Sequence, residues 1–206
     1  MTRRRTLLLV LLLCAPLRSA YAQANANAPW ALFTARFDTR TSDFIYALYG
    51  YGPTFAMVGV LHNPRSDWSE VLVAAGRMFT DDGGNSHALA AGFAQTDRMW
   101  YGQVYYVPSV RAGAVNVRAT AEFDYPITTG GQTQFALSPI SATLPSAGGI
   151  EIGAAMDFAA AAGDRSSVAI GPELRIPLPH ATLGADLERV TTGNANRLRL
   201  FFTTQF

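Results

Sequence analysis

The strongest constraint on this chain is an alternation of apolar and polar residues that recurs along most of its length. From Val115 to Tyr125, every second residue is apolar, and the residues between them are polar or charged. A period of two residues is that of a β-strand, whose successive side chains point to opposite faces. The same pattern returns in residues 150–158, 167–176, 181–190 and 196–206. The sequence therefore predicts strands that each have one apolar and one polar face.

The polar faces of these segments mix charged residues with glycine and alanine, which is typical of a confined interior. A soluble sandwich would instead turn bulky polar side chains toward water. We therefore expect the apolar face to meet lipid and the polar face to line the inside of a barrel. The residues expected to line this interior are Arg118, Glu122, Asp124, Glu151, Asp157, Glu173, Arg175, Asp186, Glu188, Arg197 and Arg199.

Turn-forming residues divide the chain into segments of about ten residues, the length of a tilted transmembrane strand. The expected strands are 30–38, 43–50, 53–62, 69–79, 86–96, 99–108, 114–125, 131–141, 149–160, 166–177, 180–190 and 196–206. That makes twelve, while eight or ten remain open because the first three segments are the least regular. In one segment, Val71 and Val73 share parity with Arg77, and a bulge near Gly76 would restore the pattern.

The last strand has a distinctive end. Leu198, Leu200, Phe202, Thr204 and Phe206 share one face, and Phe201 is the one large exception on the polar face. This ending resembles the closing strand of bacterial outer-membrane β-barrels, a porin-like class. The resemblance implies an all-β fold, a closed antiparallel up-and-down transmembrane β-barrel whose last strand ends in the periplasm. It also implies that Phe202 and Phe206 form the signal read by the barrel-assembly machinery.

The first 22 residues resemble a cleavable secretion signal. Arg3–Arg5 precede an apolar run from Leu7 to Leu13, and Ala20–Ala22 form a small-residue cleavage site. The apolar run is too short to span a bilayer. We therefore expect residues 23–206 to form the mature barrel, in the outer membrane of a Gram-negative-type bacterium. Cys14 raises a lipoprotein alternative, although Leu13 stands where a lipobox has a small residue.

Composition excludes several classes of protein. Cleavage after residue 22 would remove four of the 16 basic residues and none of the 15 acidic ones, which leaves no case for nucleic-acid binding. It would also remove the one cysteine, and with it disulfide and thiolate chemistry. No later apolar run approaches the ~18 residues of a membrane helix. The expected partner is outer-membrane lipid, and a homo-oligomer remains open.

A charged interior predicts a narrow passive channel for ions or small solutes that needs no cofactor. The alternative is a closed structural barrel without transport, in which interior charges pair across strands. Two such pairs follow from turns centred near residue 163 and between residues 193 and 194. They are Glu151 with Arg175, and Glu188 with Arg199, each on adjacent antiparallel strands.

Catalytic and metal chemistry has less support. His62, His87 and His180 show no paired metal-ligand spacing, so we expect no metal site, and Asp81–Asn85 is a turn rather than a calcium loop. A lipid-modifying barrel enzyme is the second hypothesis, because His62 and nearby serines fall at an expected outer strand end. No nucleophile, base and orienting group can be assembled from their spacing. A soluble periplasmic β-protein is the third hypothesis.

Aromatic residues gather near the ends of the expected strands. Such rings favour the headgroup zone of a membrane, so they predict interfacial girdles, although β-strands are rich in aromatic residues in any setting. The girdle residues expected are Trp30, Tyr49, Tyr51, Trp68, Phe79, Trp100, Tyr101, Tyr106, Tyr125 and Phe206.

Overall fold

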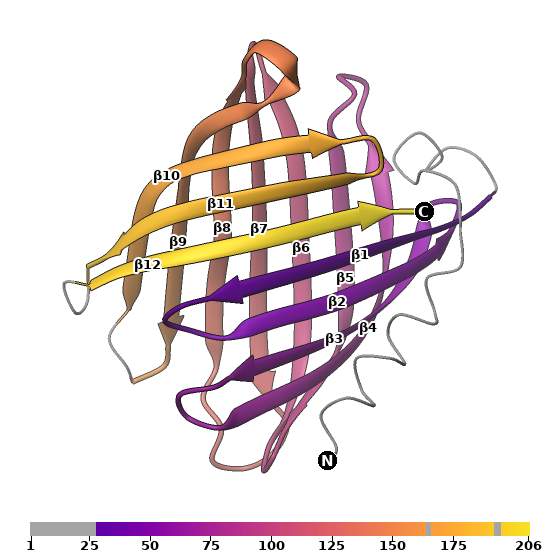
Figure 1. Ribbon diagram of the computed structural model, residues 1–206. Coiled ribbons are helices and arrows are strands. Elements are labelled where there is room, and N and C mark those ends of the chain that lie inside the picture. Colours follow the sequence, from indigo (N-terminus) through magenta and orange to yellow (C-terminus); the bar gives the residue numbers. More distant parts are fainter. Residues whose placement is uncertain (1–27, 164–165, 192–194) are drawn as a thin grey trace, which may run out of the picture.

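The computed structural model describes residues 28–163, 166–191 and 195–206. It is an all-antiparallel β-barrel (Figure 1). The predicted signal, residues 1–22, lies outside the described residues. No helix among the described residues is long and apolar enough to cross a membrane. The elements are β1 (Pro29–Asp38), β2 (Asp43–Tyr51), β3 (Thr54–Asn63), β4 (Trp68–Thr80), β5 (Ser86–Thr96), β6 (Trp100–Ala112), β7 (Val115–Pro126), β8 (Gln134–Pro145), η1 (Ala147–Gly149), β9 (Glu151–Ala161), β10 (Ser167–Leu178), β11 (Ala181–Val190) and β12 (Ala195–Gln205).

Strand β1 closes the barrel by pairing with β12, so that each of the twelve strands has two neighbours (Figure 1). The seam runs from Leu32 opposite Gln205 to Asp38 opposite Arg199. Phe206 extends it through two backbone hydrogen bonds with Ala31, of 3.0 and 3.1 Å. Closure leaves no strand edge with unpaired backbone groups, which is the condition for a sheet to sit in lipid. The predicted closed antiparallel barrel of twelve strands is thereby confirmed.

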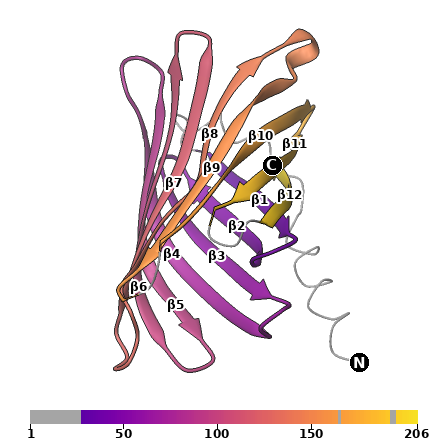
Figure 2. The ribbon, with the colours of Figure 1, turned by 90° about the vertical axis from the view of Figure 1, so that its left-hand side faces the viewer.

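The links between strands fall at the two ends of the barrel. The C-terminal end carries Phe206 and the turns that follow β2, β4, β6, β8 and β10. The opposite end carries the links that follow β1, β3, β5, β7, β9 and β11. Figure 2 shows the hairpin turns after β4, β6 and β8 projecting at the C-terminal end.

Strand bounds agree with the expected segments within a few residues, and β8 differs most. It covers Gln134–Pro145 instead of 131–141. Gly130 has a φ of +93°, a turn conformation that only glycine adopts without strain, so the preceding link extends past it. The strand then continues to the η1 turn.

The bulge predicted near Gly76 is wrong. Strand β4 pairs with β3 in unbroken register from Trp68 opposite Asn63 to Arg77 opposite Thr54. Arg77 therefore stays on the outer face, beside the start of β3. At this end of the barrel its long side chain can reach water while its stem covers apolar surface. Register shifts do occur on both sides of β8, against β7 and β9.

The outer face of the barrel is apolar all the way round. Every strand contributes at least one large apolar side chain with an exposed fraction of 40% or more. An apolar surface that surrounds the molecule is far larger than the patches found on soluble monomers, and it suits contact with lipid tails. One such residue from each strand, in order, is Phe37, Tyr49, Val58, Val71, Leu89, Val104, Phe123, Leu144, Ile152, Ile170, Leu187 and Leu198.

Phe201, the residue that interrupts the alternation of the last strand, has a defined place inside the barrel. A Cβ atom on Gly184 of β11 would lie 1.9 Å from the Phe201 ring, so the ring occupies the space of a side chain at position 184. The guanidinium of Arg175 lies over the same ring, 4.8 Å from its centroid. A missing side chain on one strand thus makes room for a large one on the next.

Replacing Gly184 with alanine is expected to lower the free energy of unfolding by about 1–3 kcal/mol, because the Phe201 ring must leave its position. Gly102→Ala is the matched control, since its nearest neighbour would lie at 3.9 Å. Denaturant unfolding in detergent micelles measures both. Adding Phe201→Leu to Gly184→Ala should recover part of the loss. Equal effects of the two glycine substitutions would contradict this packing.

Candidate functional site

The barrel encloses a cavity of about 720 Å³. It begins at the C-terminal end, where exposed turn residues such as Gly84 and Gly149 line it. Its lining extends toward the opposite end as far as Arg36, Phe44 and Leu61. The cavity is therefore a recess that opens at one end of the barrel.

Beyond the cavity the interior is filled by side chains, which we call the packed layer. Each has an exposed fraction of at most 8%. These residues come from strands on all sides of the barrel, so together they close the opposite end. The packed layer consists of Asp38, Glu70, Ala94, Tyr101, Gln103, Asp157, Glu188 and Arg197.

The cavity has two unlike walls. Strands β1–β6 present an apolar wall built on the buried residues Trp30, Phe55 and Tyr105. Trp30 is held by a hydrogen bond of 2.8 Å from its indole Nε1 to the carbonyl oxygen of Gly52. Leu32, Leu48, Met57, Met78 and Ala88 pack against this cluster. Most of the charged residues that line the cavity lie on β7–β12, the other half of the barrel.

An ion pair between Arg118 and Glu151 lies on the charged wall nearest the C-terminal end. Arg118 Nη1 and Nη2 donate to the two carboxylate oxygens of Glu151, at 2.7 and 2.9 Å. The pair forms across β8, where the small side chain of Thr143 leaves room and also donates to Glu151. The pair is partly exposed, with 32% of the Arg118 side chain accessible. Both residues line the cavity, and partly exposed pairs of this kind contribute little to stability.

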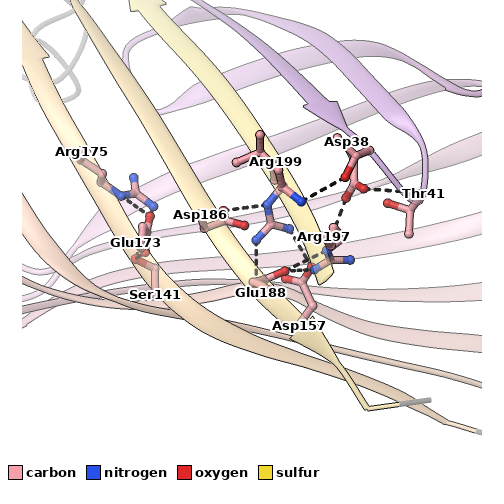
Figure 3. Close-up of polar contacts among 12 residues, drawn as sticks. Asp38, Thr41, Ser141, Asp157, Glu173, Arg175, Asp186, Glu188, Arg197 and Arg199 are labelled. Atoms are coloured by element: carbon pink, nitrogen blue, oxygen red, sulfur yellow. Dashed lines mark hydrogen bonds and ion pairs between the residues drawn. The ribbon is translucent and has the colours of Figure 1, made fainter. Parts of the chain in front are cut away.

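Two arginines of β12 form the centre of a buried ionic network (Figure 3). Arg199 donates to Asp157, Asp186 and Glu188, at 2.6, 2.8 and 3.2 Å. Arg197 donates to Glu188 and Asp157, and its Nε lies 3.5 Å from Asp38. We call Asp38, Asp157, Asp186, Glu188, Arg197 and Arg199 the ionic network. Two cations hold four carboxylates from β1, β9 and β11, so the network links strands across the closing seam.

Three further carboxylates approach one another on β4 and β7. Gln103 donates to Glu70 and Glu122, at 3.4 and 3.1 Å, and the hydroxyl of Tyr105 donates to Glu122 at 2.9 Å. One carboxylate oxygen of Asp124 is buried without a hydrogen-bond partner. Within the described part of the chain, no three His, Cys, Asp or Glu residues are arranged to hold a metal ion.

The structure divides the eleven residues expected to line the interior. Six line the cavity: Arg118, Glu122, Glu151, Arg175, Asp186 and Arg199. The other five lie beside or beyond it: Asp124, Asp157, Glu173, Glu188 and Arg197. Sequence reasoning missed Arg36 and Glu70, whose strands have mostly apolar inner faces. Their parity along β1 and β4 is the signal that places them inside.

The two predicted charge pairs fare differently. Glu151 lies opposite Arg175, as predicted, but each turns to another partner. Arg175 pairs with Glu173 on its own strand at 2.6 Å, and Glu151 pairs with Arg118. Glu188 and Arg199 do form an ion contact, of 3.2 Å, but the predicted register that sets them opposite each other is wrong by two residues.

In the observed register Glu188 lies opposite Arg197, and Asp186 lies opposite Arg199. The reason is that β12 begins at Ala195, opposite Val190, so the link is centred one residue earlier than predicted. A register shift of two residues leaves each side chain on the same face of its strand, so Asp186, Glu188, Arg197 and Arg199 all still face inward.

Of the ten aromatic residues expected in girdles, eight fall into two clear groups, and Trp68 and Phe206 are half-buried. Tyr49, Tyr51, Phe79, Trp100, Tyr106 and Tyr125 are exposed on the outer face. His87 stacks between Phe79 and Tyr106, with ring centroids 5.3 and 6.0 Å apart. Trp30 and Tyr101 are 1% and 4% exposed and point inward, so their assignment to a girdle is wrong. Both fill the apolar half of the interior instead.

His62 and Ser69 form a hydrogen bond at the opposite end of the barrel, of 3.0 Å between Nδ1 and Oγ. Asp43 faces His62 on the neighbouring strand. Its carboxylate, however, accepts the backbone N–H of Asp38 at 3.1 Å. A serine and a histidine are therefore in contact, without the hydrogen bond from a carboxylate that would orient the imidazole.

The Asp81–Asn85 segment is a turn that is stabilised by hydrogen bonds to the side chain of its first residue, Asp81. One carboxylate oxygen of Asp81 accepts the backbone N–H groups of Gly83 and Asn85, each at 2.9 Å. The amide of Asn85 donates to the other oxygen at 2.8 Å. These hydrogen bonds, that of the Asn85 side chain first, lower the pKa of Asp81 below its usual value.

Comparison of the sequence with protein families and with curated proteins finds no match. Comparison of the structure does find similar folds. The KdgM porin superposes with a TM-score of 0.61 at 8% identity, covering 86% of this chain and 99% of that one. A structure described as the KdgM porin in complex with disordered oligogalacturonate gives a TM-score of 0.62 at the same identity and coverage. The likeness shows the fold: this chain is a closed twelve-stranded barrel of the kind found in bacterial outer-membrane porins.

Proposed function

We propose that this chain is an outer-membrane barrel that provides a narrow passage for ions or small solutes. The observation that carries the proposal is the charged cavity of about 720 Å³ inside a closed barrel with an apolar exterior. The shared fold with the KdgM porin supports it. In this proposal residues 1–22 are removed on export, and the C-terminal end of the barrel faces the periplasm. The cavity then opens toward the periplasm, and the packed layer lies on the cell-surface side.

Planar-bilayer recording of the refolded protein tests the passage. Because the packed layer closes one end, the expected result is rare current steps of low conductance rather than the steady current of a wide pore. Protein-free detergent added to the same bilayer is the control. If neither the natural protein nor a variant with a reduced packed layer produces steps, the barrel is a structural one and the proposal fails.

Removal of Phe206 is expected to reduce the amount of barrel in the outer membrane and to leave protease-sensitive chain in the periplasm. Deletion also removes the two backbone hydrogen bonds to Ala31 that extend the seam. Phe206→Ala keeps those bonds and removes the ring alone. Fractionation and protease digestion of cells with each variant separate the two effects. Normal insertion of both variants would rule out the terminal ring as an assembly signal.

A second candidate is a lipid-modifying enzyme, which the hydrogen bond between His62 and Ser69 favours. Both residues point outward at the end of the barrel that would lie at the cell surface. The test is release of fatty acid from phospholipid vesicles by the refolded protein. Activity that disappears in Ser69→Ala and persists in Ser66→Ala would establish this function. Equal rates for the natural protein and Ser69→Ala would exclude Ser69 as a nucleophile.

A further inference from the structure

The cavity has the size and form of a small-molecule site. Its volume of about 720 Å³ falls within the ~300–1,000 Å³ usual for ligand pockets. It is open at the C-terminal end and ends against buried side chains, so a molecule that enters there meets a floor. Such pockets are lined mainly by apolar and aromatic groups, with few polar groups that fix orientation.

The apolar wall is built mainly from aromatic rings and methionine side chains. Trp30, Phe55 and Tyr105 form one buried cluster, and the methionines Met57 and Met78 pack against it. Aromatic rings provide large rigid contact surfaces, and methionine side chains adapt to irregular shapes. A small inorganic ion gains little from such a wall. A molecule with an apolar body gains from burying it there.

Arg36 lies at the floor of the cavity, at the seam between the two walls. Its strand neighbours are β2 of the apolar wall and β12 of the charged wall. Its Nε is buried without a hydrogen-bond partner, and its guanidinium lies 5.6 Å from the centroid of the Phe44 ring. Among the ion pairs of the described residues, none includes Arg36. A buried donor without an acceptor is unfavourable, and an anion at this point would satisfy it.

The carboxylates near Arg36 each accept hydrogen bonds from other donors through one of their two oxygens. Asp186 and Asp157 accept hydrogen bonds from Arg199, and Glu122 accepts from Tyr105 and Gln103. The second oxygens of Asp157 and Asp186 are buried without a partner, and among the described arginines at the floor Arg36 is the one that keeps a buried donor for an anionic ligand.

We infer that the cavity binds a small amphipathic anion, with its carboxylate at Arg36 and its apolar body against the wall of β1–β6. The inference rests on the proposed function for the membrane barrel and deepens it by naming the class of solute. A planar guanidinium binds a carboxylate through paired hydrogen bonds, which gives the ligand a fixed orientation.

The test compares three probes with the same apolar body: 4-phenylbutyrate, 4-phenylbutanol and 4-phenylbutylamine. Calorimetric titration of the barrel in lipid nanodiscs, with empty nanodiscs subtracted, measures each affinity. The expected result is that the acid binds about tenfold or more tightly than the alcohol. In Arg36→Gln the affinity for the acid should fall to that for the alcohol, while Arg36→Lys keeps part of the preference. Arg77→Gln, on the outer face, is the charge-matched control and should leave all three affinities unchanged.

A second variant tests the apolar wall. Ala88 lines the cavity and packs against the Trp30 cluster, so Ala88→Phe should fill the space and weaken binding of every probe. Equal affinities for acid and alcohol, preference for the amine, or unchanged binding in Ala88→Phe would each overturn the inference. Conductance is recorded separately on the same preparations. Binding that is selective for the acid, without any current, would support the inference and contradict the proposed passage. Current without selective binding of the acid would support the passage and contradict the inference.

Discussion

Replacing Glu188 and Arg197 together with alanine is expected to raise the conductance of the barrel severalfold. The two residues lie opposite each other on β11 and β12, and their exposed fractions are 1% and 6%. Their removal takes a carboxylate and a guanidinium out of the packed layer. Water can occupy the space, because Asp157 and Arg199 remain there as hydrogen-bonding partners. Because both residues are replaced, neither Glu188 nor Arg197 remains as a buried charge without the other.

The matched control removes another ion pair from the same barrel. Arg118 and Glu151 lie in the open part of the interior, so Arg118→Ala/Glu151→Ala should change the single-channel conductance little. Planar-bilayer recordings of both double variants, with far-ultraviolet circular dichroism to verify folding, give the comparison. An equal rise in both would place the barrier elsewhere than in the packed layer.

Arg199→Gln is expected to lower the free energy of unfolding by about 3–5 kcal/mol, the usual loss when one partner of a buried ionic group is removed. Arg199 is 1% exposed and contacts three carboxylates. Without it, Arg197 alone faces four carboxylates, which repel one another in a poorly solvated interior. Urea unfolding of the barrel in lipid vesicles measures the loss.

Two further variants make this prediction specific. Arg111→Gln removes an exposed arginine at the rim and should change stability by no more than about 0.5 kcal/mol. Arg199→Gln/Asp186→Asn also removes the carboxylate opposite position 199 and should recover part of the loss. A loss in Arg199→Gln as small as that in Arg111→Gln would show that the ionic network does not stabilise the barrel.

The sequence predicts the second half of this barrel better than the first, for a physical reason. In β7–β12 the two faces differ sharply, so parity assigns Glu151, Asp186 and Arg199 to the interior. In β1–β5 the inner face is itself apolar, with Leu32, Leu48 and Phe55, and alternation loses its contrast. The apolar wall, Arg36 and Glu70 were therefore not predicted, although the strands that carry them were.

Register and partner choice lie beyond what alternation can predict. A shift of two residues leaves every side chain on its own face, so nothing in the pattern distinguishes Arg197 from Arg199 as the residue opposite Glu188. Partner choice depends on neighbours further away. Arg118 reaches Glu151 because the strand between them carries Thr143 rather than a large residue.

The ionic network also bears on how the last two strands enter the membrane. Arg197 donates a hydrogen bond to Glu188, nine residues earlier in the chain, and Arg199 donates one to Asp186, thirteen residues earlier. Both hydrogen bonds therefore lie within the β11–β12 hairpin. Short loops close at low entropic cost, and these bonds require no other strand. The hairpin thus carries its own counter-charges, and its two arginines can cross the hydrocarbon region as neutralised pairs. Asp38 joins Arg197 when β1 docks, so this one contact reports on completion of the barrel.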